Sequence, residues 1–176
     1  MIDKPRIEQA QKNVRQYVED GLLKKEKQEL AKQRYIENSQ QSLNLANSLL
    51  THPSKPYSWI IVISYYAMFY ISNAILLHFG YKTQEKIVHK VTNEALIVFI
   101  LPKLTKELLE EYEEIKENAL EIAQATAEEL VTSYSLELNK RSQFQYNMLE
   151  ETKAAKAKTS VERASKFIFE MKKLLE

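Results

Sequence analysis

One long segment of the chain carries no formal charge, and it constrains the fold more than any other feature. From Tyr57 to Tyr81 there is no Asp, Glu, Lys or Arg, and the segment opens with the apolar run Trp59–Ile63. This length suits a membrane-spanning helix as well as the central helix of a bundle. Serine, tyrosine, asparagine and histidine side chains interrupt it, and the neighbouring segments are apolar on one face only. We therefore predict no membrane span, and expect residues 58–79 to form the most buried helix of a bundle.

The composition favours an all-α protein. Of 176 residues only 2 are glycine and 4 are proline, so few turn-forming residues separate segments that are rich in helix formers. A chain of this length suits one domain with one core. We predict an antiparallel, up-and-down bundle of five to six helices without a β-sheet. It forms a single domain over residues 1–176, in which residues 1–22 are an added N-terminal helix.

Apolar residues at three- and four-residue spacing predict the other helices. Pro5 suits a helix start, and Gly21 suits the position just after a helix end. The pattern indicates helices over residues 5–20, 23–50, 86–101 and 104–130.

The C-terminal third is expected to contain two further helices. A bend at residues 131–133 precedes a helix over residues 134–147. Thr159 and Glu162 match a capping box, which predicts that a separate last helix begins there.

The net charge of +1 hides an uneven distribution. Residues Lys106–Leu130 contain nine glutamates and two lysines, net −7, whereas Lys140–Glu176 contains nine lysines and arginines and five glutamates, net +4. Two interpretations stay open. In the first, both segments have ordinary solvated faces. In the second, the basic segment forms a groove near Arg141 that attracts phosphate.

The sequence argues against several kinds of site. Its glycines stand alone, so no phosphate-binding loop or dinucleotide motif can be written. The three histidines form no Glu-x-x-His pair of the di-iron type, and the glutamates of residues 110–117 spread around a helix as on a solvated face. Cysteine is absent, and the N-terminus has no apolar signal region. We expect no cofactor, no metal and a cytoplasmic location.

The best pointer to function lies near the C-terminus, in the run Asn-Lys-Arg-Ser-Gln-Phe-Gln-Tyr-Asn of residues 139–147. Arg141 stands five residues before Tyr146. The planar guanidinium of Arg141 can hold a phosphate, and Ser142 and Gln145 add hydrogen-bonding groups beside it. These four residues are candidates for binding a ligand.

This run and an upstream segment resemble the HEPN family, in its small free-standing prokaryotic branch. Residues 65–69, Tyr-Tyr-Ala-Met-Phe, resemble part of the family's second core helix. Residues 80–83 with His89 resemble the loop and histidine that follow it. The resemblance adds Tyr66 and His89 to the candidate ligand-binding residues, although His89 also suits an ordinary boundary position. Adjacent helix residues point to different sides, so at most one of Tyr65 and Tyr66 faces a site.

The C-terminal part of the resemblance bears on chemistry. Arg141 and Tyr146, followed by Ala164 and Phe167, resemble the branch's Arg, four residues, Tyr pattern and its closing helix. Catalytic HEPN proteins are metal-independent ribonucleases that use Arg, four to six residues and then His, with two such motifs meeting across a dimer. Here Tyr146 stands at the histidine's place, and a tyrosine with a pKa of about 10 is a poor base near neutral pH.

Three functions remain open. The first is a HEPN-like module that binds nucleotide or RNA phosphate. The resemblance implies that it is a homodimer within a toxin–antitoxin or nucleotidyltransferase-associated system, and not an efficient nuclease. The second is a metal-independent RNA endonuclease toxin, in which Arg141 acts with Tyr146 or His89 as catalytic candidates. The third is a helical interaction module without nucleotide chemistry. It would use an exposed apolar stripe at Leu108, Ile115 and Ile122.

Overall fold

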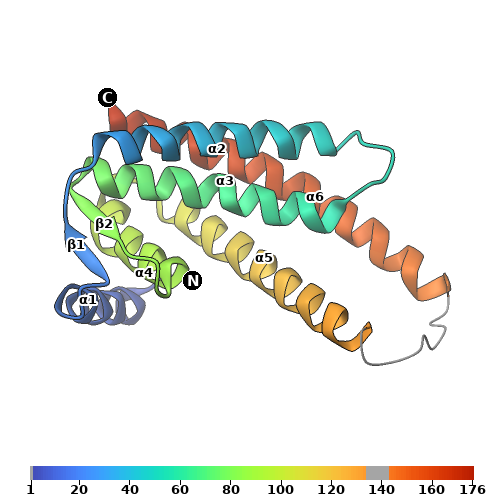
Figure 1. Ribbon diagram of the computed structural model, residues 1–176, viewed down its shortest axis with the longest axis horizontal. Coiled ribbons are helices and arrows are strands. Elements are labelled where there is room, and N and C mark those ends of the chain that lie inside the picture. The colour runs from blue at the N-terminus through green and yellow to red at the C-terminus, as the bar shows by residue number, and fades with distance from the viewer. Residues whose placement is uncertain (1, 134–142) are drawn as a thin grey trace.

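The computed structural model describes the backbone of residues 2–133 and 143–176, and the side chains of residues 2–124 and 153–176. Within these residues the chain forms six α-helices and one two-stranded sheet, so the all-α class is confirmed (Figure 1). The helices are α1 (Lys4–Glu19), α2 (Glu29–Leu49), α3 (Tyr57–His78), α4 (Val88–Ala95), α5 (Lys106–Ser133) and α6 (Gln143–Lys172). The strands are β1 (Leu23–Lys25) and β2 (Tyr81–Thr83). Shorter helical turns cover Leu96–Ile100, Leu101–Lys103 and Lys173–Leu175.

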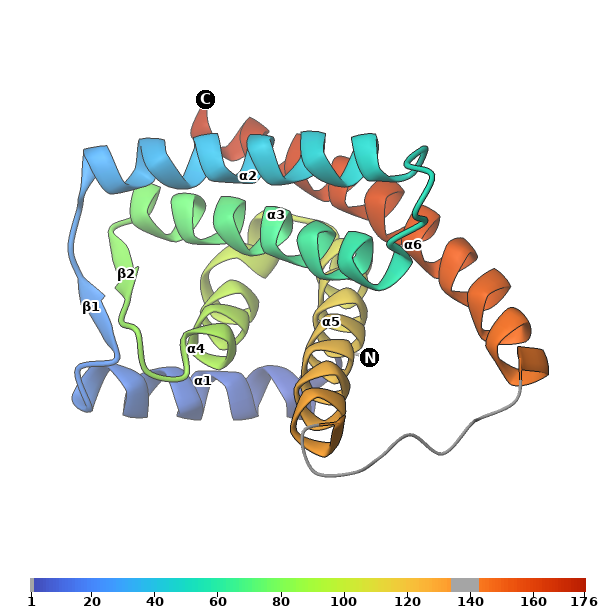
Figure 2. The ribbon, with the colours of Figure 1, turned by 45° about the vertical axis from the view of Figure 1, so that its right-hand side comes forward.

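Helix α3 lies at the centre of the bundle. It packs against α2, α5 and α6, and it runs antiparallel to α2 in both ribbon views (Figures 1 and 2). Its buried residues include Ile60, Tyr65, Ala67 and Ile75, and more of its residues are buried than in any other described helix. The predicted central position of residues 58–79 is therefore confirmed.

Two polar side chains of α3, Ser72 and Asn73, find partners inside the protein, whereas the buried Ser64 hydroxyl has none among the described residues. Ser72 Oγ donates to Met68 O at 2.7 Å, and Asn73 Nδ2 donates to Phe69 O at 2.9 Å. Asn73 Oδ1 accepts from Thr83 Oγ1 at 2.7 Å. By length and apolar composition α3 could cross a membrane, but 83% of its most apolar window is buried inside the structure. A membrane is thus not needed to cover this helix.

Helices α1 and α4 lie together at one end of the bundle (Figure 2). The Asp3 side chain accepts from the Arg6 N–H at 3.0 Å and caps α1, and Pro5 occupies its first turn. Gly21 has φ +69°, which ends this helix. The predicted N-terminal helix is confirmed.

The small sheet is a correction to the sequence prediction. Residues 23–25 do not begin the second helix; they form β1, which pairs antiparallel with β2, and α2 starts only at Glu29. Leu23 pairs with Thr83, and both are buried. Three-residue strands are too short to show an alternating pattern, and the pairing joins segments almost sixty residues apart, so local spacing does not reveal them.

The C-terminal helices are longer than predicted. Helix α5 continues through residues 131–133 without the expected bend, and α6 runs without a break through Thr159. The capping-box prediction at Thr159 was wrong, because the alanine-rich residues before it continue the helix. Of the helix predicted over residues 134–147, residues 143–147 are helical, and residues 134–142 lie outside the described part.

The apolar stripe of α5 is part of the core. Leu108 and Ile115 are buried, and Ile122 is half-buried. The interaction-module hypothesis needs this stripe to be exposed. The packing of α5 against α3 and α6 covers it instead, so this requirement is not met.

A substitution tests the tight packing around α3. Ala67 is fully buried, and its carbonyl accepts a hydrogen bond from Ser39 Oγ at 2.7 Å. We expect Ala67→Leu to lower the free energy of unfolding by about 1–3 kcal/mol, because the larger side chain overpacks the contact between α2 and α3. Urea denaturation measures this. The same replacement at Ala123, which is exposed on α5, is the control, and equal effects at both positions would contradict the prediction.

Candidate functional site

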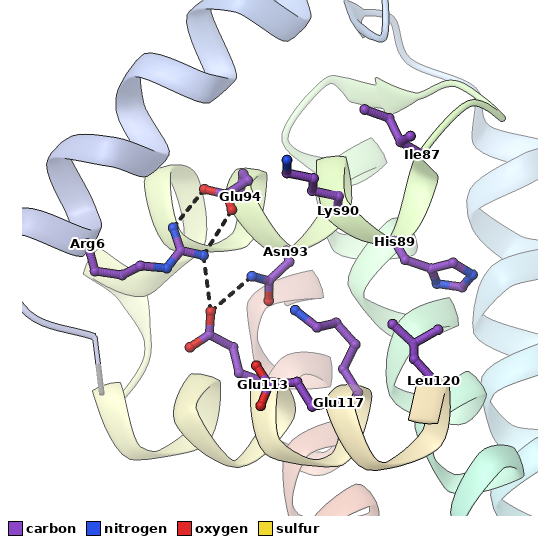
Figure 3. Close-up of a pocket in the computed structure, with 10 residues that line it drawn as sticks. Arg6, Ile87, His89, Lys90, Asn93, Glu94, Glu113, Glu117 and Leu120 are labelled. Atoms are coloured by element: carbon purple, nitrogen blue, oxygen red, sulfur yellow. Dashed lines mark hydrogen bonds and ion pairs between the residues drawn. The ribbon is translucent and has the colours of Figure 1, made fainter. Parts of the chain in front are cut away.

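A cleft of about 590 Å³ opens where α1, α4 and α5 meet (Figure 3). It is lined by Arg6, Ile87, His89, Lys90, Asn93, Glu94, Glu113, Lys116, Glu117 and Leu120. These residues come from three separate parts of the sequence. The helical spacing on α4 and α5 places them on facing sides of the cleft.

One side of the cleft is a hydrogen-bonded ion cluster. Arg6 donates from both terminal nitrogens to the two carboxylate oxygens of Glu94, at 2.8 and 2.9 Å. Arg6 also reaches Glu113 at 3.1 Å, and Glu113 accepts from Asn93 Nδ2 at 2.9 Å (Figure 3). Glu94 is buried, so Arg6 provides its compensating charge. The cluster ties α1 to α4 and α5.

The other side of the cleft holds a tyrosine–histidine pair. Tyr65 is buried, and its hydroxyl lies 2.7 Å from His89 Nδ1. Burial raises the pKa of Tyr65, so its hydroxyl keeps its proton. The neighbouring Tyr112 hydroxyl partly offsets this rise in the pKa of Tyr65, and donation to Nδ1 satisfies the Tyr65 proton. Neutral His89 then carries its own proton on Nε2, which makes Nε2 a donor.

Two lysines of the cleft have no ion pair with any residue that the structure describes. Lys90 is exposed, whereas Lys116 is half-buried. Burial lowers the pKa of Lys116, opposed by the nearby charges of Glu113 and Glu117. Burial also lowers the pKa of His89, and the charge of Lys116 lowers it further. Cations and carboxylates balance in the cleft as a whole, but Arg6 engages two of the three carboxylates.

An exposed aromatic ring borders the histidine. Tyr66 is 37% exposed, and its ring centroid lies 5.8 Å from that of His89 in an edge-to-face arrangement. The structure therefore brings together two predicted site residues, Tyr66 and His89. As expected for adjacent residues, Tyr65 packs inside while Tyr66 faces outward.

No known family model, curated protein or solved structure matches the chain. The resemblance to the HEPN family therefore stays a prediction.

The cleft's described lining does not include the other predicted site residues, whose side chains lie outside the described part of the chain. Gln145 and Tyr146 belong to the first turn of α6, and both ribbon views place that end of α6 away from α4. Their side chains, and Arg141 and Ser142 entirely, lie outside the described part of the chain. Within the described residues, no group of three or more acidic, histidine or cysteine side chains is arranged to hold a metal ion.

Several residues of the cleft were missed by the sequence prediction. The glutamates of α5 were expected to be solvated, yet Glu110 accepts from the Ile2 N–H at 2.7 Å and Glu113 binds Arg6. Glu94 did give a signal, because it is the only charged residue between Val91 and Ile100. A single carboxylate in such a stretch indicates a buried cation partner.

The histidine gives a testable pH dependence. The folded pKa of His89 lies below its unfolded value of about 6.5, so the unfolded chain binds more protons in this range. We expect the unfolding free energy to fall as the pH is lowered from 6.5 toward the folded pKa, and to be unaffected by His89 above that window.

Urea denaturation between pH 5 and pH 8 measures the effect. His89→Gln should remove part of the pH dependence. His52→Gln, at an exposed position in the turn before α3, serves as the control. A pH profile that is unchanged by His89→Gln would refute the expectation.

Proposed function

We propose that the protein is a HEPN-like helical module that binds the phosphate of a nucleotide or of RNA, and that it is not an efficient nuclease. The observation that carries the proposal is the arrangement at the cleft. His89 lines the cleft together with the unpaired lysines Lys90 and Lys116, its Nδ1 is held by Tyr65, and the exposed ring of Tyr66 packs against its ring. Donors and cations suit phosphate oxygens, and an exposed ring suits a stacked base.

The same arrangement argues against proton transfer by His89. A general base needs an unprotonated nitrogen facing the substrate. Because Tyr65 donates to Nδ1, the free nitrogen Nε2 carries the proton. His89 then positions an anion and does not take a proton from a ribose hydroxyl. The nuclease alternative would need another base, and a tyrosine with an ordinary pKa of about 10, as at the Tyr146 position of the motif, is a poor base near neutral pH.

Arg141 completes the proposal as a second phosphate contact. Its side chain is a permanent cation, and it belongs to the basic C-terminal segment. In this proposal the RNA or nucleotide is shared with a partner protein of the nucleotidyltransferase type, or with a toxin–antitoxin partner. Such partners follow from the HEPN resemblance.

Binding of a nucleotide tests the proposal. We expect Lys116→Ala to weaken binding of adenosine monophosphate by about tenfold or more, because a charge-assisted hydrogen bond is lost. Tyr66→Ala should also weaken it, by about fivefold to a hundredfold, while Tyr66→Phe retains the ring. Isothermal titration calorimetry measures the affinities. Lys24→Ala, at an exposed lysine of β1, is the charge-matched control.

A metal-free cleavage assay on single-stranded RNA separates binding from catalysis. Wild-type protein should bind the RNA and cleave it slowly or not at all, and Arg141→Ala should weaken the binding. Tyr146→His should raise cleavage if the rest of the site is complete. Robust wild-type cleavage that Arg141→Ala abolishes would replace this proposal with the endonuclease.

The proposal includes a homodimer. Trp59 is 60% exposed at the start of α3, and Leu45 is half-exposed near the end of α2. Because α2 and α3 are antiparallel, both lie at the same end of the bundle. Exposed apolar side chains such as these can meet those of a second copy without bringing like charges together.

Sedimentation tests the dimer. At tens of micromolar we expect a species twice the 20.6 kDa chain mass, and Trp59→Glu should shift it toward the monomer because a charge is buried at the contact. Phe169→Glu, at an equally exposed aromatic on α6, is the control. A wild-type monomer at these concentrations would count against the dimer.

A further inference from the structure

A second cleft, of about 360 Å³, lies between α5 and α6. It is lined by Ile61, Glu114, Ile115, Asn118, Ala155, Lys156, Thr159, Ser160 and Arg163. Its α5 residues occupy a different face of the helix from Glu113, Lys116 and Glu117, which line the first cleft. The two clefts are thus separate sites.

Helix α6 supplies most of the polar groups of this cleft. Lys156, Thr159, Ser160 and Arg163 follow each other at steps of three, one and three, which places them along one face of the helix. Arg163 Nη1 is held by Glu114 at 2.9 Å. Lys156 forms no ion pair with any described residue. Two cations against one carboxylate leave the cleft with an excess of positive charge.

Ser160 is the most informative residue here. The residue is only 5% exposed, yet its Oγ is not one of the fully buried, unpartnered polar atoms of the described structure. Ser165, five residues later on the same helix, bonds as a helical serine commonly does: its hydroxyl donates to the Val161 carbonyl one turn earlier, at 2.9 Å. No described bond holds the Ser160 hydroxyl in this way, so its Oγ is open to water from the cleft, and a ligand can replace that water. The Ser160 hydroxyl lines the cleft, where a ligand can accept its hydrogen bond.

We propose that this cleft binds a phosphate monoester. A terminal phosphate has three oxygens that accept hydrogen bonds, and the cleft offers the ammonium of Lys156, the hydroxyls of Thr159 and Ser160, and the remaining guanidinium N–H groups of Arg163. The positive excess favours a dianion over a singly charged phosphodiester. Among its described lining residues the cleft has the apolar Ile61 and Ile115 but no aromatic ring on which a base could stack. The site is therefore expected to recognise the phosphate and not a base.

This inference goes beyond the proposed function, because it needs neither a base nor Tyr66. The phosphate monoester can belong to a small metabolite or to the end of an RNA. Both sources share the terminal phosphate, and the experiment separates them.

Titration followed by amide NMR tests the site. The ligands are inorganic phosphate, ribose 5-phosphate, a short RNA with a 5′-phosphate, and dimethyl phosphate as the diester. We expect the monoesters to shift amide signals around Thr159 and Ser160, and dimethyl phosphate to bind more weakly. If ribose 5-phosphate binds with higher affinity than the RNA, the site is assigned to metabolites. If the RNA binds with higher affinity, the site is assigned to RNA ends.

Matched variants make the outcome decisive. Lys156→Ala should weaken phosphate binding by about tenfold or more, and Ser160→Ala should weaken it with the fold retained by circular dichroism. Lys158→Ala removes the same charge from an exposed position of the same helix and should change binding by less than about twofold. Equal losses in Lys156→Ala and Lys158→Ala, or no shifts near Ser160, would overturn the proposal.

The first cleft provides an independent control. Lys116→Ala should leave these shifts unchanged. Monoester binding that depends on Lys156, with no nucleotide binding that depends on Lys116, would refute the proposed function and leave this inference standing.

Discussion

The fold depends on covering α3. An uncharged helix of 22 residues is stable in water only when its whole circumference is buried. Helices α2, α5 and α6 cover most of it, and α4 and β2 also contact it. Ser72 and Asn73 are satisfied within this packing by bonds to carbonyls one turn earlier. The exposed rings of Trp59 and Tyr66 mark where this coverage ends.

The first cleft depends on a different interaction, the contact of Arg6 with Glu94 and Glu113. Without Arg6, the buried carboxylate of Glu94 would have no cation partner, at a cost of about 1.5–3 kcal/mol. The same contact holds α1 across α4 and α5, so the N-terminal helix helps to form the cleft. Glu94 and Glu113, which bind α1 through Arg6, are thereby neutralised, and this leaves the lysines of the cleft available to a ligand.

Sequence periodicity predicted the elements whose signals are local. The uncharged run located α3, and Pro5 and Gly21 marked the two ends of α1. The β1–β2 pairing could not be predicted in this way, because it joins residues distant in sequence. The capping box at Thr159 failed for another reason, since a sequence that can cap a helix can also lie inside one. The adjacency of Tyr66 and His89 was suggested only by the family resemblance, and Arg6 and Lys116 join them through tertiary packing that no spacing rule describes.

The charge of α5 shows why a helix's composition does not give the sign of its sites. Its glutamates were expected to form a solvated acidic face. In the structure Glu111 contacts Lys166, Glu113 contacts Arg6 and Glu114 contacts Arg163. In these contacts, cations from α1 and α6 pair with carboxylates of α5. Lys116, on the same helix, has no ion pair among the described residues. A helix with a strongly negative sequence can therefore lie between two clefts that each present an unpaired lysine. The sign of a binding site is set by the charges that packing leaves unpaired. At the first cleft these are two lysines against Glu117, and at the second cleft the unpaired charge is Lys156, so each cleft keeps a positive excess among its unpaired charges.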